Sequence, residues 1–116
     1  MDVDEFKKRT KKLGLRVIRL AESLPATRTS KVIGNQLIRS GTAVGSNYRA
    51  ACRAKSGKDF IAKMKIVEEE CDESIYWIEM LVEAGEIKQS LVANLLHEAQ
   101  EILKMTVASI KTARCR

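Results

Sequence analysis

The 116-residue sequence contains one proline, one histidine and few aromatic residues: two Phe, two Tyr and one Trp. A single proline leaves almost every segment free to be helical, because proline inside a helix removes a hydrogen-bond donor. No apolar run approaches the roughly 20 residues that span a bilayer. The N-terminus has acids where a signal peptide has bases, and no apolar segment follows them. These absences predict a single cytoplasmic domain over residues 1–116 that does not enter a membrane.

Residues suited to catalysis or metal binding are sparse. Cys52, Cys71 and Cys115 show no metal-ligand spacing, and the first two fall on apolar seams, where a free thiol is usually a small core residue. A di-iron bundle needs Glu-x-x-His on two of its helices, and that motif does not occur. The chain also lacks the Gly-x-x-x-x-Gly-Lys phosphate loop and any Ser, His and Asp grouping. We therefore expect no enzyme, no metal and no cofactor.

Periodic apolar positions fill most of the chain. In four stretches such residues alternate at steps of four and three, the spacing of helices that pack in a bundle. Leu24-Pro25 ends the first stretch, Ser56 and Asp59 resemble a capping box, and Gly85 is suited to a helix C-terminus. The expected helices run over about residues 4–23, from a cap at Thr27, Thr29 or Ser30 to about 54, 58–84 and 88–113. Because short connections make neighbouring helices antiparallel, the predicted fold is all-α, an antiparallel up-down-up-down four-helix bundle.

The expected second helix has two contrasting sides. Gly34, Gly41 and Gly45 recur on one seam, and each Gly costs roughly 1 kcal/mol against Ala inside a helix, so we expect helix packing at unusually short distance there. On the other side, five basic residues fall within an arc of roughly 80° on a helical wheel. These residues are Arg28, Lys31, Arg39, Arg49 and Arg53.

The basic arc has two interpretations. It would extend about 38 Å at 1.5 Å per residue, which spans several phosphates of a nucleic-acid strand. Since aromatic side chains able to stack on bases are nearly absent, RNA or DNA binding would depend on the backbone and be weakly sequence-specific. Alternatively, the arc is a solvated face that the acidic third helix partly neutralises. Residues 23–58 hold seven Lys or Arg and no acid, whereas residues 59–86 hold nine acids and two Lys.

A second seam on the expected third helix mixes apolar and acidic residues. Its members are Ile66, Glu70, Glu73, Trp77 and Met80. An ordinary surface helix has one apolar stripe, so this helix should be covered on two sides. Ile66, Trp77 and Met80 are accordingly the candidate oligomer interface. The two acids either lie at the wet edge of the seam or form a structural polar network with Arg39 and Asn47 that fixes the helix register.

The segment Ile38–Ala54 resembles the second helix of a known family. It reads Ile-Arg-Ser-Gly-Thr-Ala-Val-Gly-Ser-Asn-Tyr-Arg-Ala-Ala-Cys-Arg-Ala and is similar to the small four-helix bundle proteins of the 23S ribosomal RNA intervening-sequence family. The segments Asp59–Lys63 and Val67–Trp77 fit the third helix of that family. The resemblance implies a cytoplasmic bacterial protein, often encoded within or near inserted segments of ribosomal RNA genes, that forms a homopentamer.

The resemblance extends at a distance to the accessory protein of diversity-generating retroelements, a basic pentameric bundle that binds reverse transcriptase and nucleic acid. Two functions therefore stay open. In the first, the chain is a non-enzymatic oligomeric accessory factor that binds RNA or DNA through its basic second helix. In the second, it is a structural oligomer that binds a protein partner and has no nucleic-acid role.

Overall fold

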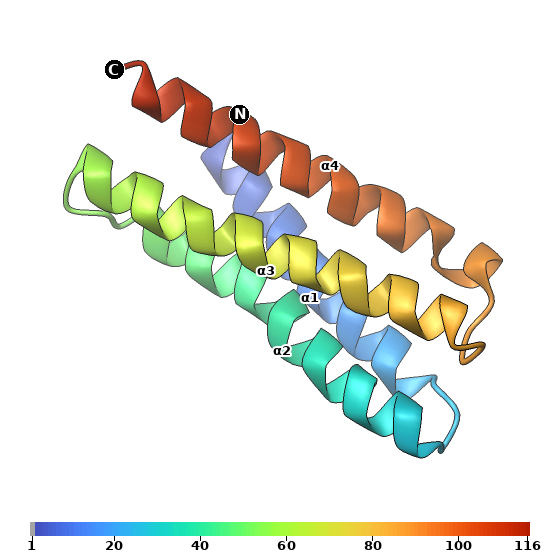
Figure 1. Cartoon of the computed structure of the whole chain (residues 1–116). Coiled ribbons are helices and arrows are strands. Elements are labelled where there is room, and N and C mark those ends of the chain that lie inside the picture. Colours follow the sequence, from blue (N-terminus) through green and yellow to red (C-terminus); the bar gives the residue numbers. More distant parts are fainter. Residues whose placement is uncertain (1) are drawn as a thin grey trace.

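The computed structural model describes residues 2–116, and this part of the chain forms four helices and no strand. They are α1 Val3–Glu22, α2 Arg28–Ala51, α3 Gly57–Glu83 and α4 Gln89–Arg114. Figure 1 shows them lying lengthwise, with both chain termini and the α2–α3 turn at one end and the other two turns at the opposite end. The predicted up-down-up-down bundle is confirmed. Across residues 2–116, no helix is long and apolar enough to cross a membrane.

Side-chain caps begin the first three helices. The Thr27 hydroxyl accepts a hydrogen bond from Ser30 N at the start of α2, and the Ser56 hydroxyl accepts one from Asp59 N at the start of α3. The reciprocal bond of the expected capping box is shifted by one residue, because the Asp59 carboxylate accepts from Lys55 N. These bonds satisfy backbone donors that a helix N-terminus leaves without an internal partner.

The C-terminus of α3 follows the prediction made for Gly85. This glycine has φ 77°, its N–H donates to Val82 O, and Glu86 N donates to Leu81 O. Both bonds belong to the motif in which a left-handed residue terminates a helix, a conformation that favours glycine. In contrast, α2 ends at Ala51, earlier than expected, because the last residues before α3 form tight turns instead of a further helical turn.

The core lies on the predicted seams of α1, α3 and α4. On α2 it lies mostly beside the predicted glycine seam, at Ile33, Leu37, Val44 and Ala51. The seam residues of α3 are buried from Met64 to Leu81, and the α4 seam is buried at Leu95, Ala99, Ile102 and Thr106. At the end that carries the termini, the rings of Phe6 and Tyr48 meet edge to face with centroids 4.7 Å apart. The extended shape of 47 × 21 × 20 Å therefore encloses one continuous core along the bundle.

The glycine seam of α2 faces α1. A Cβ added at Gly41 would lie 2.7 Å from Val17 Cγ1, and one added at Gly45 would lie 3.2 Å from the Thr10 carbonyl. Real Cβ atoms are not found as close to a neighbour as 2.7 Å. The two helices can therefore approach this closely only because Gly41 has no side chain. Gly34 differs, because a Cβ there would make an ordinary 3.4 Å contact with Leu24 Cδ1. The expectation of close packing thus holds for two of the three glycines.

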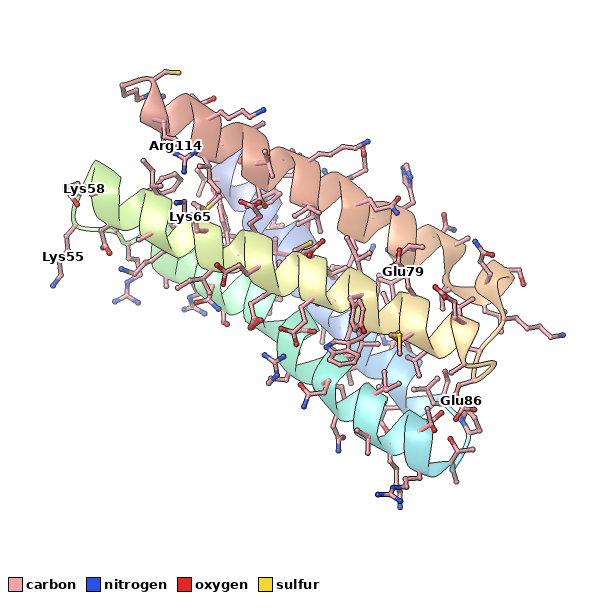
Figure 2. All side chains as sticks on the ribbon, viewed as in Figure 1. Lys55, Lys58, Lys65, Glu79, Glu86 and Arg114 are labelled. Atoms are coloured by element: carbon pink, nitrogen blue, oxygen red, sulfur yellow. The ribbon has the colours of Figure 1, made fainter. Side chains whose placement is uncertain are left out.

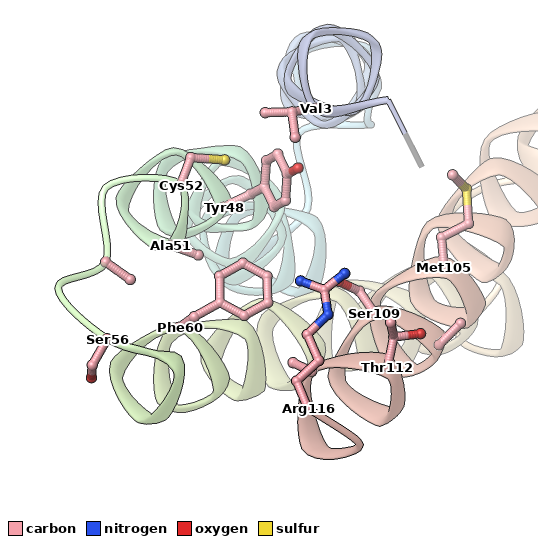
Figure 3. A pocket seen from close by; sticks show the side chains of 13 residues that line it. Val3, Tyr48, Ala51, Cys52, Ser56, Phe60, Met105, Ser109, Thr112 and Arg116 are labelled. Carbon is pink, nitrogen blue, oxygen red and sulfur yellow. The ribbon is translucent and has the colours of Figure 1, made fainter.

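The opposite side of α1 is more loosely closed. Near the chain termini, a cleft of about 730 Å³ separates the C-terminal part of α4 from the start of α1, the end of α2 and the start of α3. Figure 3 shows this cleft, with Val3 and Tyr48 on one side and Met105, Ser109 and Arg116 on the other. Further along, the Arg9 guanidinium joins α1 to α4 through two hydrogen bonds to the Glu98 carboxylate, at 2.7 and 3.0 Å.

Candidate nucleic-acid interface

All five basic residues of the predicted arc are exposed, and four of them lie on the side of α2 that faces away from the core. The helical period places these four, since the buried residues Leu37 and Val44 occupy the opposite side of the wheel. Arg53 was expected on the helix but lies in the turn that follows Ala51. Among residues 2–116, four of the five form no ion pair within 4.0 Å. We call these four the basic strip: Arg28, Lys31, Arg49 and Arg53.

Arg39 is the exception, because it binds acids of α3. Its guanidinium lies 3.3 Å from a Glu70 carboxylate oxygen and donates a second bond to Glu73. Trp77 Nε1 also donates to Glu73, at 2.9 Å. The two carboxylates are half-buried, so the contacts of Arg39 resemble the expected network between α2 and α3. Arg39 is consequently less available to an external phosphate than the basic strip.

Asn47 does not take part in these contacts. Its side-chain amide donates to Ala43 O of its own helix, at 2.8 Å. The antiparallel pairing of the second and third helices predicted that Asn47 would lie within reach of the two acids. A short amide can instead bond to the preceding turn of its own helix, which is a common competitor of tertiary bonds. The expectation that Asn47 joins Arg39, Glu70 and Glu73 is therefore wrong.

The basic strip continues beyond α2 at one end of the bundle. Figure 2 shows Lys55 and Lys58 at the end that also carries Arg114, whereas Glu86 lies at the far end. Lys55 lies two residues after Arg53 in the turn, Lys58 lies in the first turn of α3, and both are exposed. Sequence reasoning omitted them from the site because a helical wheel says nothing about residues in a turn. Their closeness to Arg53 in the chain was the available signal.

A groove runs between α1 and α2 beside the basic strip. It has a volume of about 740 Å³, and its charged lining consists of Lys7, Lys8, Lys11, Arg49 and one acid, Asp4. Leu15 and Ile18 of α1 line it further along. The close approach at Gly45 forms part of the groove floor, so the small residues of the seam also shape this surface. We call it the α1–α2 groove.

The predicted oligomer interface is only partly exposed. Ile66 is 42% exposed, but Trp77 and Met80 are half-buried and pack against the core of the chain itself. Tyr76, which the sequence analysis did not select, is 51% exposed and meets the Trp77 ring edge to face. The outer side of α3 thus presents Ile66 and Tyr76 among acids.

Outside the basic strip, the shifted pKa values of Cys71 and Glu98 reflect burial and a helix-to-helix ion pair. Burial raises the pKa of the Cys71 thiol to about 12, so this thiol stays protonated at neutral pH. The Arg9 guanidinium holds the pKa of Glu98 below its usual range through their hydrogen bonds. Within residues 2–116, no three His, Cys, Asp or Glu side chains lie close enough together to hold a metal ion.

Comparisons with known proteins agree with the sequence resemblance. The family model described as 23S rRNA-intervening sequence protein matches residues 4–108. A crystal structure described as a protein with unknown function from the S23 ribosomal protein family of Bacteroides thetaiotaomicron superposes with a TM-score of 0.86 at 30% identity. That match covers 96% of this chain and 99% of the other. A search of curated proteins finds no match. The chain belongs to the 23S rRNA-intervening sequence protein family.

Proposed function

We propose that this protein is a non-enzymatic homo-oligomeric accessory factor that binds RNA or DNA through the basic strip of α2 and the adjoining Lys55 and Lys58. The observation that carries this proposal is the set of exposed cations without acidic partners on a helix side that the core does not need. Phosphates are the natural partner of such a surface, because each contact releases condensed counterions.

Binding through the backbone fits this surface better than base recognition. The rings of Phe6 and Tyr48 are buried, and Trp77 is half-buried against the core. The exposed ring of Tyr76 lies among acids on the outer side of α3, so no exposed ring accompanies the basic strip. Arg side chains can instead hold phosphate oxygens with their planar fork. We therefore expect similar affinity for unrelated sequences and strong dependence on salt.

A homopentamer in the bacterial cytoplasm is part of the same proposal. The resemblance to the intervening-sequence proteins supports both the ring and its association with ribosomal RNA genes. A ring would repeat the basic strip once per subunit, and several weak strips acting on one strand give avidity without any new contact.

The test is a binding titration with a fluorescent single-stranded RNA of arbitrary sequence. Fluorescence anisotropy measures the affinity at several salt concentrations. In the double variant Arg53→Gln/Lys55→Gln, affinity should fall for every RNA tested. The slope of log affinity against log salt should become shallower by about 0.7 for each single-strand phosphate contact removed. Arg28→Gln/Lys31→Gln then measures how far along α2 the RNA extends.

The matched control is Lys88→Gln/Lys104→Gln, which removes the same charge from exposed positions away from the strip. Affinity should stay near that of the parent. Equal losses in both double variants would mean that only net charge matters, and the strip would then not be the site. A parent protein without salt-dependent binding to RNA or DNA would instead favour the second function, a structural oligomer with a protein partner.

A further inference from the structure

Two outer surfaces of the bundle are complementary in both charge and apolar character. The α1–α2 groove carries Lys8 and Lys11, followed along α1 by Leu15, which is 47% exposed. The outer side of α3 carries exposed Glu69 and, two turns further along, the exposed ring of Tyr76. Neither Lys11 nor Glu69 forms an ion pair among the described residues. Each surface therefore lacks a partner within its own chain.

Contacts inside the bundle determine which residues lie at the same height. A Cβ at Gly45 of α2 would lie 3.3 Å from Lys11 N, so these two residues are level. Across the other side of α2, the hydroxyls of Ser40 and Ser74 are joined by a 3.0 Å hydrogen bond. Because α2 and α3 are antiparallel, Gly45, five residues after Ser40, is level with Glu69, five residues before Ser74. Lys11 and Glu69 consequently lie at the same height along the bundle.

In a ring of identical copies, residues at the same height can meet across the interface between adjacent copies. Rotation about an axis parallel to the helices changes neither the height nor the direction of a helix. Since α1 and α3 run in the same direction, α3 of one copy would lie parallel to α1 of the next (Figure 1). Lys11 would then meet Glu69, and Ile18 would meet Tyr76, because each apolar residue is seven positions further along its helix. A contact between two different surfaces is heterologous and can close into a ring.

We propose that the outer side of α3 in one copy packs into the α1–α2 groove of the next, with the Lys11 ammonium facing the Glu69 carboxylate and Leu15 and Ile18 covering Tyr76. The occupant of the groove is a second copy of this chain. This inference rests on the proposed homo-oligomer and is independent of nucleic-acid binding. It leaves Arg28 and Lys31 on the free side of α2 and Arg53 in the turn beyond the helix, whereas Arg49, which lines the groove, lies at the edge of the contact.

The test is a charge-reversal cycle on the intact chain without nucleic acid. Mass is measured by sedimentation velocity over a range of concentrations for Lys11→Glu, Glu69→Lys and the double variant. Each single change puts like charges opposite each other, and we expect the dissociation constant to rise roughly tenfold or more. The double variant restores opposite charges in every interface, so its assembly should return towards that of the parent. Circular dichroism checks that all variants fold.

Lys104→Glu is the matched control, because this α4 side chain is 79% exposed and lies outside both surfaces. It should assemble like the parent. Single variants that assemble normally, or a double variant that stays as weak as the singles, would overturn the interface. A parent that sediments as a monomer at micromolar concentration would instead refute the proposed homo-oligomer itself.

Discussion

One side of α2 packs closely against α1, whereas another side is exposed and basic. Towards α1, the helix carries small residues, and at Gly41 even one methyl group would collide with Val17. Away from the core, it carries the basic strip, whose side chains form no ion pair among residues 2–116. The first side is constrained by packing. On the second side, only Arg39 uses its charge in a contact within the described chain, with Glu70 and Glu73.

This difference separates residues that stabilise the bundle from residues that are free to serve a partner. Close helix contact is sensitive to volume, because protein interiors are as dense as crystals and cannot absorb extra atoms. Exposed cations barely affect folding, since isolated surface charges contribute little to stability. Substitutions on the two sides should therefore have different effects, and the following predictions go from the largest to the smallest.

The largest effect is expected for Gly41→Leu. The new side chain would enter the space of Val17 in the closest part of the α1–α2 contact, and overpacking of this kind typically costs about 1–3 kcal/mol. Urea unfolding followed by circular dichroism measures the loss. A variant with the stability of the parent would mean that α1 and α2 do not depend on a close approach at this position.

Glu98→Gln tests a helix contact made by charge instead of volume. The folded-state pKa of Glu98 is lowered, chiefly by hydrogen bonding to Arg9. A lowered carboxyl pKa contributes stability that is present above the unfolded-state pKa and is lost as pH falls through the folded-state pKa. The substitution should remove about 1 kcal/mol at neutral pH, because the pair is partly exposed.

Acid titration of stability supplies the control for this variant. Below the ordinary range of a Glu carboxyl, the parent loses the contribution of Glu98 and the two proteins should converge. A constant difference down to low pH would show that the substitution acts through packing and not through the charge of Glu98.

Gly34→Ala should have a smaller effect with the opposite sign. A Cβ at this position makes only an ordinary contact with Leu24, and Ala is the better helix former. We expect the free energy of unfolding to rise by about 0.5–1 kcal/mol. A loss of stability would mean that the close approach of α1 and α2 extends further than Gly41 and Gly45.

The smallest effect on folding is expected for Arg53→Gln/Lys55→Gln. Both side chains are exposed and form no ion pair among residues 2–116, so the free energy of unfolding should change by less than about 0.5 kcal/mol. A larger loss would show that the charges stabilise the bundle, and their effect on RNA affinity could not then be assigned to direct contact.

Much of this fold follows from the sequence, because its periodicity is clear and its chain breaks are few. The seam of α3 and the helix end at Gly85 both lie where spacing and turn chemistry predicted them. Asn47 and Arg9 illustrate the side-chain contacts that could not be predicted from the sequence. A wheel gives the direction in which Asn47 points but not whether its amide prefers its own backbone, and no local pattern pairs Arg9 with Glu98, almost ninety residues away.

For the charged residues, too, helical spacing predicted exposure but not every contact. Exposure of the basic residues followed from helical spacing, since the buried side of α2 is apolar and small. The contact of Arg39 with Glu70 and Glu73 was one of two expected alternatives for these acids. Choosing between the alternatives requires the register of α2 against α3, which spacing within one helix leaves undetermined. The contribution of Lys55 and Lys58 depends on a turn that brings them next to Arg53.

Lysine acetylation read by mass spectrometry, with and without a generic single-stranded RNA, tests the central claim most directly. It reports each ammonium group in the unmodified protein and needs no variant. We predict that RNA protects Lys31 and Lys55 of the basic surface, while the exposed Lys88 and Lys104 react as fast as they do without RNA. Equal reactivity of all four lysines, or protection confined to Lys88 and Lys104, would contradict the assignment of nucleic-acid binding to the outer side of α2.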